Sequence, residues 1–302
     1  MPKPRQFPLI LILFALSISL TAQESAQRFS VAVLDFGETQ TGLHAAAKFS
    51  AALSSHKELS LADREESRAA ARGVGYTGSL NMTLQEARDL GGALGTDFYI
   101  TGDAQTLRRS PSTGAVYYEA YASIFIVSSR TGRLVLWERQ SFQASSPESA
   151  TEALMKDLSA RTARYREAIL AARETEIKER AQVLERVAAV TPVIEDAPDD
   201  EAAAAREGLR LPRPYRRLRP NYPETAASAE AEATVDVQLD IDVRGEISRL
   251  EIVRWAGFGL DEAAMSTARQ LHFVPARRDG QAIPMRVLLR YNFRRPPKAG
   301  NQ

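Results

Sequence analysis

The chain contains no cysteine and only three histidines. Without cysteine it can form no disulfide, thiolate nucleophile, cysteine-bound zinc site or cysteine-linked lipid anchor. The histidines, His44, His56 and His272, lie far apart in the sequence, so no Ser–His–Asp arrangement is indicated. Nothing in the sequence therefore indicates an enzyme, and we expect no catalytic residue, no cofactor and no metal site.

An excess of one charge is also absent. The 39 Lys and Arg residues balance 38 Asp and Glu residues, which leaves a formal net charge of +1. Aromatic residues make up only 7% of the chain, and they are not interleaved with a basic patch. We therefore expect no nucleic acid as a partner, and no small-molecule substrate is evident.

Two short patterns match ligand-binding motifs in their residue types but not in the secondary structure predicted around them. Residues 73–78 fit G-x-G-x-x-G, but a dinucleotide site needs a strand before this motif and a helix directly after it. Here a predicted helix precedes it and a loop follows. Asp240, Asp242 and Glu246 are acidic residues near a turn, but they alternate on the solvated face of a predicted strand, so a calcium site is not expected.

Long hydrophobic runs are missing as well. Residues 7–20 form an apolar run after Lys3 and Arg5, and the small residue Ala22 follows it. This is the pattern of a secretory signal, and the run is shorter than the roughly 20 residues that span a bilayer. We predict a signal peptide over residues 1–22 and an exported mature chain. The alternative is an uncleaved anchor that leaves the rest of the chain outside the inner membrane.

Alternating strand and helix patterns dominate residues 28–145. Strands are predicted at 29–36, 59–62, 98–102, 116–128 and 134–142, and helices at 42–55, 63–72 and 83–94. Thr83 and Glu86 form a capping box at the start of the third helix, and Gly95 ends it. Residues 130–132 predict a tight hairpin. The alternation predicts an α/β sheet domain covered by helices.

Residues 146–190 predict one long helix with a narrow apolar stripe. Ser146 is a good N-cap, and Pro147 suits the first helical position. Either the start of the helix packs on the preceding domain and its end is a solvated spacer, or the stripe is a coiled-coil dimer seam. Residues 191–214 contain several prolines, with acidic residues before basic ones, and predict a flexible tether. The basic block could instead contact an anionic surface or a partner protein.

The pattern over residues 215–294 predicts a second, smaller domain, followed by a tail at 295–302. Apolar residues at 235, 237, 239 and 241 alternate with polar ones, which indicates a strand with one buried and one solvated face. A turn at Arg244 leads to a second strand, in which the spacing of Ile247 and Leu250 suggests a bulge. An amphipathic helix at 261–271 and an alternating strand at 285–293 complete a β-β-α-β order.

Short sequence motifs at the ends of these predicted strands and helices resemble those of the C-terminal domain of the TonB family. They are Tyr222-Pro223, the run 260–264, Phe273-x-Pro275-Ala276, Asp279-Gly280 and the last strand, which closes at Phe293. In that family the domain binds outer-membrane receptors, which add a short extended segment to its edge. The resemblance implies partner contacts in the last strand and in the stretch that enters the domain: Arg286, Leu288 and Arg290, and Arg219, Pro220, Asn221 and Tyr222.

Residues 28–145 resemble the α/β domain shared by the curli-secretion protein CsgG and the N-terminal domain of TolB. The matching marks are the strand at 31–36 and the helix end and strand at 94–102. Members of the CsgG family carry a lipidated cysteine and long amphipathic hairpins, and this chain has neither, so pore formation is not implied. The chain also departs from full TonB proteins, because residues 7–20 contain no histidine and the long Pro-rich spacer is absent.

These resemblances imply a periplasmic protein of a bacterium with an outer membrane. The first hypothesis is a TonB-like protein that binds an outer-membrane transporter or another envelope partner by β-strand addition, with energy transduction for transmembrane transport as an extension of that role. The alternative is a structural or assembly protein of the envelope that forms homo-oligomers through its CsgG-like N-terminal domain.

Overall fold

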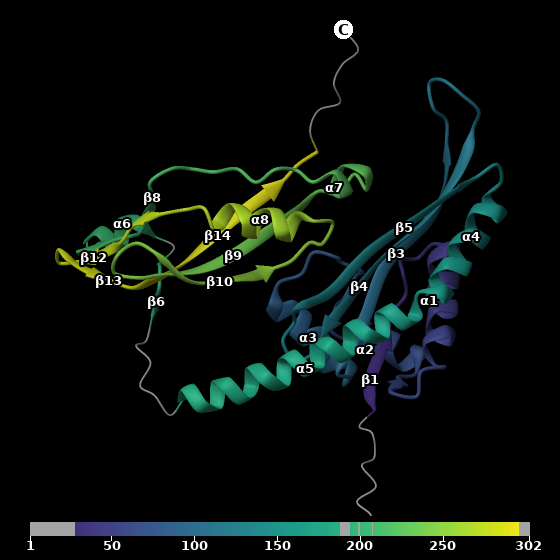
Figure 1. Cartoon of the computed structure of the whole chain (residues 1–302), viewed down its shortest axis with the longest axis horizontal. Helices are drawn as coiled ribbons and strands as arrows, with labels where there is room; N and C mark the ends of the chain where they lie inside the picture. The colour runs from purple at the N-terminus through teal and green to yellow at the C-terminus, as the bar shows by residue number, and fades with distance from the viewer. Residues whose placement is uncertain (1–27, 188–193, 199, 207, 296–302) are drawn as a thin grey trace, which may run out of the picture.

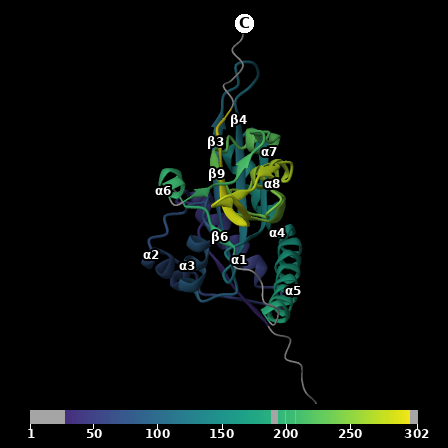
Figure 2. The same ribbon diagram turned by 90° about the vertical axis from the view of Figure 1, so that its left-hand side faces the viewer.

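A computed structural model describes residues 28–187, 194–198, 200–206 and 208–295. The predicted signal peptide 1–22 and all but the first residue of the predicted tail 295–302 lie outside the described residues. Figure 1 shows two sheet-based domains side by side, with α5 leading from the first toward the second. Seen from the end in Figure 2, α2 and α3 lie on one side of the molecule and α4 and α5 on the other.

The N-terminal domain contains one five-stranded sheet of order β2-β1-β3-β4-β5. The first three strands in this order are parallel, and β3, β4 and β5 are antiparallel to one another. The elements are β1 (Phe29–Val33), α1 (Gln40–Leu53), β2 (Leu59–Leu61), α2 (Arg64–Gly73), α3 (Leu84–Leu94), β3 (Phe98–Arg109), β4 (Tyr117–Ser128) and β5 (Leu134–Ala144). The predicted order of strands and helices is confirmed, although β3 continues beyond the predicted end at residue 102.

Helices cover both faces of this sheet, as the alternation predicts. On one face, α1 and the helices after β5 bury a core that includes Phe49 and Tyr165, whose rings meet edge to face at a centroid distance of 5.0 Å. On the other face, α2 and α3 bury Leu90, Tyr99 and Phe125. The capping box of α3 is present, since Thr83 accepts from the Glu86 N–H and the Glu86 carboxylate accepts from the Thr83 N–H.

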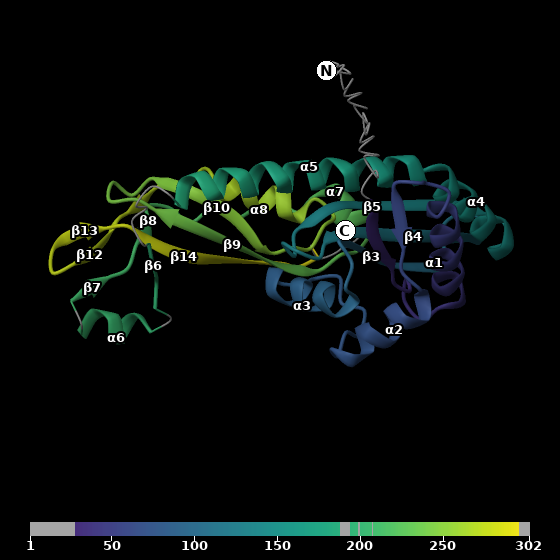
Figure 3. The same ribbon diagram turned by 90° about the horizontal axis from the view of Figure 1, so that it is seen from below.

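The structure divides the predicted helix 146–190 into α4 (Pro147–Ala160) and α5 (Thr162–Val187). The Arg161 N–H still donates to the Asp157 carbonyl, four residues back, as in an α-helix. The Arg164 N–H donates to the Arg161 carbonyl, three residues back, which is the spacing of a 3₁₀ turn. The break allows Leu158 before it and Tyr165 after it to be fully buried in the same core. Farther along, Ile177 is 56% exposed, and Figure 3 shows α5 extending past the N-terminal domain.

The described part of the predicted tether 191–214 contains short elements that pair with the C-terminal domain. They are β6 (Glu195–Asp196), α6 (Glu201–Arg206), β7 (Leu209–Arg210) and β8 (Arg213–Pro214). Strand β6 pairs with β14, β7 with β12 and β8 with β11. Ala204 and Leu209 are buried with Ala276 and Met285, so apolar burial holds this charged segment against the domain.

The C-terminal domain has the predicted β-β-α-β order. Its main elements are α7 (Glu224–Ser228), β9 (Ala233–Ile241), β10 (Ile247–Arg254), α8 (Leu260–Ala268) and β14 (Met285–Phe293), with β11 (Phe273–Val274), β12 (Ala276–Arg278) and β13 (Gln281–Ile283) between the last two. The sheet has the order β10-β9-β14-β6, and α8 packs on one face over Val235, Val237 and Leu239. The predicted bulge is present, as a register shift between Ile247 and Arg249.

Candidate functional site

The outer side of β14 is the candidate partner-binding edge. Strand β14 pairs with β9 over its whole length, from Met285 to Phe293. On its other side it pairs only with the two-residue strand β6, at Met285 and Arg286. Among the described residues no strand pairs with β14 beyond Arg286 on that side, so its backbone hydrogen-bonding groups there are available to another chain.

One hydrogen bond to β6 shows which residues of β14 turn their backbone N–H and C=O groups toward the open side. The Arg286 carbonyl accepts from the Ala197 N–H at 2.7 Å, so the backbone of Arg286 faces outward, away from β9. Along a strand, the backbone groups of every second residue face the same neighbour. Because the pairing with β9 has no register shift, the backbone groups of Leu288, Arg290 and Asn292 also face the open side.

Buried ion pairs support the face of the sheet opposite α8. Asp236 and Asp240 are each only 3% exposed. Arg286 donates to Asp240 through Nε at 2.6 Å and Nη2 at 3.0 Å, and Arg290 donates to Asp236 at 2.8 and 2.9 Å. These hydrogen bonds raise the pKa of both guanidinium groups. The prediction of a solvated face is therefore wrong at Asp236 and Asp240, because arginines from neighbouring strands cover them.

Between the two arginines, Leu288 is 54% exposed. It lies on the same face as Arg286 and Arg290, since alternate residues of a strand share a face. The open edge therefore presents one apolar side chain between two guanidinium groups that are already held by carboxylates. This arrangement gives the edge a fixed surface on which an added strand can place an apolar side chain.

The predicted partner residues of the entering stretch lie on a different element. Arg219 and Asn221 are exposed in the segment between β8 and α7. The Tyr222 hydroxyl donates to the Ala231 carbonyl at 2.7 Å, and its ring packs against the core of the domain. Tyr222 thus fixes the entry of the chain into the sheet, and no described hydrogen bond or ion pair joins Arg219, Pro220 or Asn221 to the predicted residues of β14.

One end of β10, the other outer strand of the sheet, docks on the N-terminal domain. Trp255 is 1% exposed and stacks on Phe125 at a centroid distance of 5.9 Å, and its indole N–H donates to the Gly132 carbonyl at 3.0 Å. The Asn81 amide donates to the carbonyls of Trp255 and Thr234 at 2.6 and 2.8 Å. The domain contact therefore lies at the β10 side of the sheet and leaves the β14 edge accessible.

Sequence reasoning did not find this interface. The glycine at position 257, just after Trp255, is the part of this interface that the sequence shows. In the structure Gly257 has φ +73°, and a Cβ there would lie 2.7 Å from the Phe125 ring. Ion pairs extend the contact: Arg133 of the N-terminal domain bonds Glu251 at 2.7 Å, and Arg254 bonds Glu86 at 3.5 Å. Charged residues of this kind are common on surfaces, so their pairing across domains is not visible in the sequence.

The motifs set aside in the sequence have structural roles. Residues 73–78 form the end of α2 and the loop after it, and the Tyr76 hydroxyl hydrogen-bonds the Thr101 hydroxyl at 2.8 Å. Asp242 closes the turn after β9 by accepting from the N–H groups of Arg244 and Glu246. Within the described residues no group of three or more acidic or histidine side chains is arranged to hold a metal ion, and none of the described helices is both long and apolar enough to cross a membrane.

The C-terminal domain is thus a four-stranded sheet with one helix on one face and a last long strand, β14, that is paired on its outer side, among the described residues, only at Met285 and Arg286. Residues 219–294 match the family model of the Gram-negative bacterial TonB protein C-terminal. The predicted resemblance of the C-terminal domain to the TonB family is thereby confirmed. A search of the curated proteins found no match to the chain.

Several solved structures are similar to parts of the chain. The C-terminal domain of TonB from Pseudomonas aeruginosa is 20% identical, with 29% of this chain and 89% of that chain covered and a TM-score of 0.25. Lipoprotein GNA1162 from Neisseria meningitidis is 15% identical, with 47% and 99% covered and a TM-score of 0.32. The hypothetical protein CT253 from Chlamydia trachomatis is 12% identical, with 44% and 95% covered and a TM-score of 0.33. The resemblance of residues 28–145 to CsgG and TolB stays a prediction.

Proposed function

We propose that this protein binds a partner in the envelope of a Gram-negative bacterium by accepting an extended segment of that partner along β14. The observation that carries the proposal is the open edge of β14 within a domain that matches the TonB C-terminal family model. Main-chain hydrogen bonds from Leu288, Arg290 and Asn292 would supply affinity, and the side chains beside the edge would supply selectivity. The partner class is an outer-membrane transporter or another envelope protein that exposes an extended segment.

The proposed contacts are Arg286, Leu288 and Arg290 on β14 and Arg219, Pro220, Asn221 and Tyr222 on the entering stretch. Leu288 would contact an apolar side chain of the added strand. Arg286 and Arg290 would act mainly by holding the face of the sheet, since both are engaged by buried carboxylates. The exposed Arg219 would attract acidic residues of the partner, an effect that salt screens.

We restrict the role to partner binding and leave energy transduction out of it. Motor coupling in the TonB family requires a membrane segment with a functional histidine, and residues 7–20 contain none. A mature protein that begins at Gln23 and is recovered from the periplasm would agree with this restriction. An intact N-terminus recovered in the inner membrane would restore the transducing role.

The test is the substitution Leu288→Pro. Proline cannot donate a hydrogen bond, and at Leu288 the missing N–H faces the open edge and not β9, so strand addition should be lost while the domain stays folded. The probes are peptides copied from the periplasm-facing N-terminal segments of outer-membrane receptors of the same bacterium. We expect at least a tenfold weaker Kd, measured by calorimetry, with an unchanged circular dichroism spectrum.

Leu288→Ala is the matched control, because it removes the side chain and keeps the N–H. It should weaken binding less than Leu288→Pro if backbone pairing dominates. Equal binding by the wild-type protein and Leu288→Pro would contradict strand addition at β14.

A further inference from the structure

A groove lies between the two domains, on the opposite side of the C-terminal sheet from the β14 edge. It has a volume of about 460 Å³, which is within the range of ligand-binding clefts. Its walls include two continuous stretches of chain, Arg133–Trp137, which enters β5 at Leu134, and Arg249–Ile252 in β10. Consecutive residues of a strand point to opposite faces of a sheet, so a hollow that touches all of Arg249–Ile252 lies along the edge of β10. The start of β5 borders the hollow as the last strand of its own sheet.

Along residues 134–137 of β5 and 249–252 of β10, no other described strand pairs with these edges, and only beyond them does Arg254 pair with Thr83 in an isolated bridge. Strand β5 is the last strand of the N-terminal sheet, and β10 is the outermost strand of the C-terminal sheet on that side. The groove thus places two rows of backbone hydrogen-bonding groups opposite each other. Open edges are the sites where a sheet accepts another extended chain.

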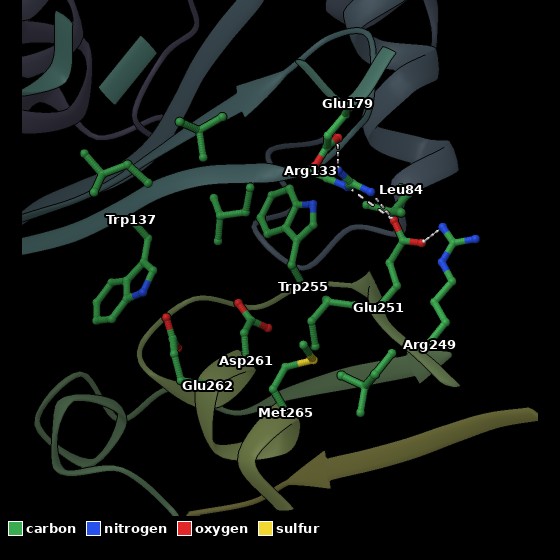
Figure 4. A pocket seen from close by; sticks show the side chains of 15 residues that line it. Leu84, Arg133, Trp137, Glu179, Arg249, Glu251, Trp255, Asp261, Glu262 and Met265 are labelled. Carbon is green, nitrogen blue, oxygen red and sulfur yellow. Dashed lines mark hydrogen bonds and ion pairs between the residues drawn. The ribbon is translucent and has the colours of Figure 1, made fainter. Parts of the chain in front are cut away.

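The groove is closed at each end by contacts between the domains. At one end Arg133 bonds Glu251 at 2.7 Å and Glu179 at 2.8 Å, and Arg249 bonds Glu251 at 2.6 Å. At the other end the rings of Trp137 and Phe258 lie 5.5 Å apart. Figure 4 shows the side chain of Trp255 between these two ends and Met265 on the C-terminal wall. The space therefore suits a short segment with apolar side chains.

The charged side chains along the groove differ in whether they have an ion-pair partner. Both of its arginines are engaged by Glu251, whereas Glu262 is exposed and has no ion-pair partner among the described contacts. Figure 4 shows Glu262 across from the indole of Trp137. A cation between a carboxylate and an indole ring is attracted by both groups.

We propose that this groove binds a short extended segment of a partner protein, with apolar side chains and one Lys or Arg that lies between Trp137 and Glu262. The segment adds a strand to the open edges of β5 and β10. This second acceptor site is separate from the β14 edge, and it requires both domains in their docked arrangement. The protein then holds two extended segments at once, one on each side of its C-terminal sheet.

The protein carries its own reporter for this site, since its only two tryptophans, Trp137 and Trp255, both line the groove. The probe is a short capped peptide of alternating Val and Thr with a central Lys, and the matched peptide carries Glu in place of Lys. We expect the Lys peptide to produce a saturable change in tryptophan fluorescence. We also expect it to slow amide hydrogen exchange at residues 133–137 and 249–252.

Two variants distinguish this site from β14. Glu262→Lys should weaken binding of the Lys peptide by about fivefold and favour the Glu peptide, as expected for a partly exposed charge pair. Leu288→Pro, on the opposite edge, should leave the fluorescence titration unchanged. The proposal is overturned if millimolar Lys peptide changes neither fluorescence nor exchange, if Glu262→Lys has no effect on peptide choice, or if Leu288→Pro abolishes the titration.

Discussion

At the scale of single residues, buried charge in the C-terminal sheet is the feature that the alternating pattern conceals. Asp240 is 3% exposed, and Arg286 holds it with two hydrogen bonds. A buried carboxylate that loses its cation leaves an uncompensated charge, which costs much more than the pair contributes as a whole. The pair therefore restricts which residues can occupy these two positions, of which Arg286 lies at the start of the proposed binding edge.

We predict that Arg286→Met lowers the free energy of unfolding by about 2 to 4 kcal/mol, because it leaves Asp240 buried without a cation. Urea unfolding followed by circular dichroism measures this change. The double variant Asp240→Asn with Arg286→Met should recover most of the loss. A double variant as unstable as the single one would show that Arg286 acts through packing and not through charge.

A second residue-scale feature is the carboxylate of Asp261 at the start of α8. It accepts hydrogen bonds from the N–H groups of Ala256 and Gly257 at 2.9 and 2.8 Å, and so holds the loop that follows Trp255. Burial raises the pKa of Asp261 to about 6, although these two hydrogen bonds act in the opposite direction. The folded protein therefore binds this proton more tightly than the unfolded chain, whose ordinary value is 3.8.

From this difference we predict that Asp261 makes the protein more stable as the pH falls from 7 toward 4. The stabilisation is lost as the pH rises through about 6, and it amounts to at most about 3 kcal/mol. Asp261→Asn should flatten this part of the curve of unfolding free energy against pH. Glu152→Gln, which removes an exposed carboxylate on α4 away from Asp261, serves as control. Parallel curves for the wild-type protein and Asp261→Asn would contradict the prediction.

At the scale of elements, β6 limits the length of the open edge. Its pairing with β14 covers Met285 and Arg286, and Arg278 bonds Glu195 of β6 at 2.6 Å. The side of β14 that remains open begins after Arg286. The acidic part of the predicted tether is thus a short edge strand, whose charges also discourage unwanted pairing.

We predict that Ala197→Pro detaches β6, because it removes the N–H that donates to the Arg286 carbonyl. Amide exchange at residues 195–197 should become faster, and receptor peptides that bind β14 should bind at least as tightly as before. Ala197→Ser keeps the N–H and is the matched control. Weaker peptide binding by Ala197→Pro than by Ala197→Ser would show that β6 supports the site and does not restrict it.

At the scale of the whole molecule, docking of the two domains depends on Trp255. Its ring is buried against Phe125, and both of its N–H groups donate to carbonyls of the N-terminal domain, those of Met82 and Gly132. Beside Trp255, the side chains of Ile252, Val253 and Phe258 pack against the same N-terminal core cluster. A fixed arrangement places the β14 edge on the side away from the N-terminal domain and the groove between the domains.

We predict that Trp255→Ala costs about 3 to 5 kcal/mol, the usual effect of removing a buried aromatic side chain. It should undock the domains and leave each one folded. Small-angle scattering should show a larger radius of gyration, and limited proteolysis should separate the two domains sooner. Leu288→Ala, far from the interface, is the control. Unchanged scattering for Trp255→Ala would mean that the ion pairs and Asn81 hold the domains without it.

Much of the fold was predictable because it is local. The capping box at Thr83, the buried apolar positions of β9 and the bulge near Ile247 each depend on residues close together in the chain, and all three are confirmed. The single helix 146–190 was predicted from its apolar stripe. The stripe could not show the break at Arg161, because the break serves the packing of Leu158 and Tyr165 into a core built by distant segments.

The candidate site divides in the same way. The sequence by itself determined the β-β-α-β order of residues 233–293, because periodicity and turn residues act over short distances, whereas the proposal of β14 as the binding strand came from the resemblance to the TonB family. Only the tertiary structure decided that β6 covers the start of that strand and that arginines cover Asp236 and Asp240. It alone joined the domains through Trp255. These features depend on contacts between residues far apart in the chain, and a local sequence pattern does not indicate which distant surfaces will be in contact.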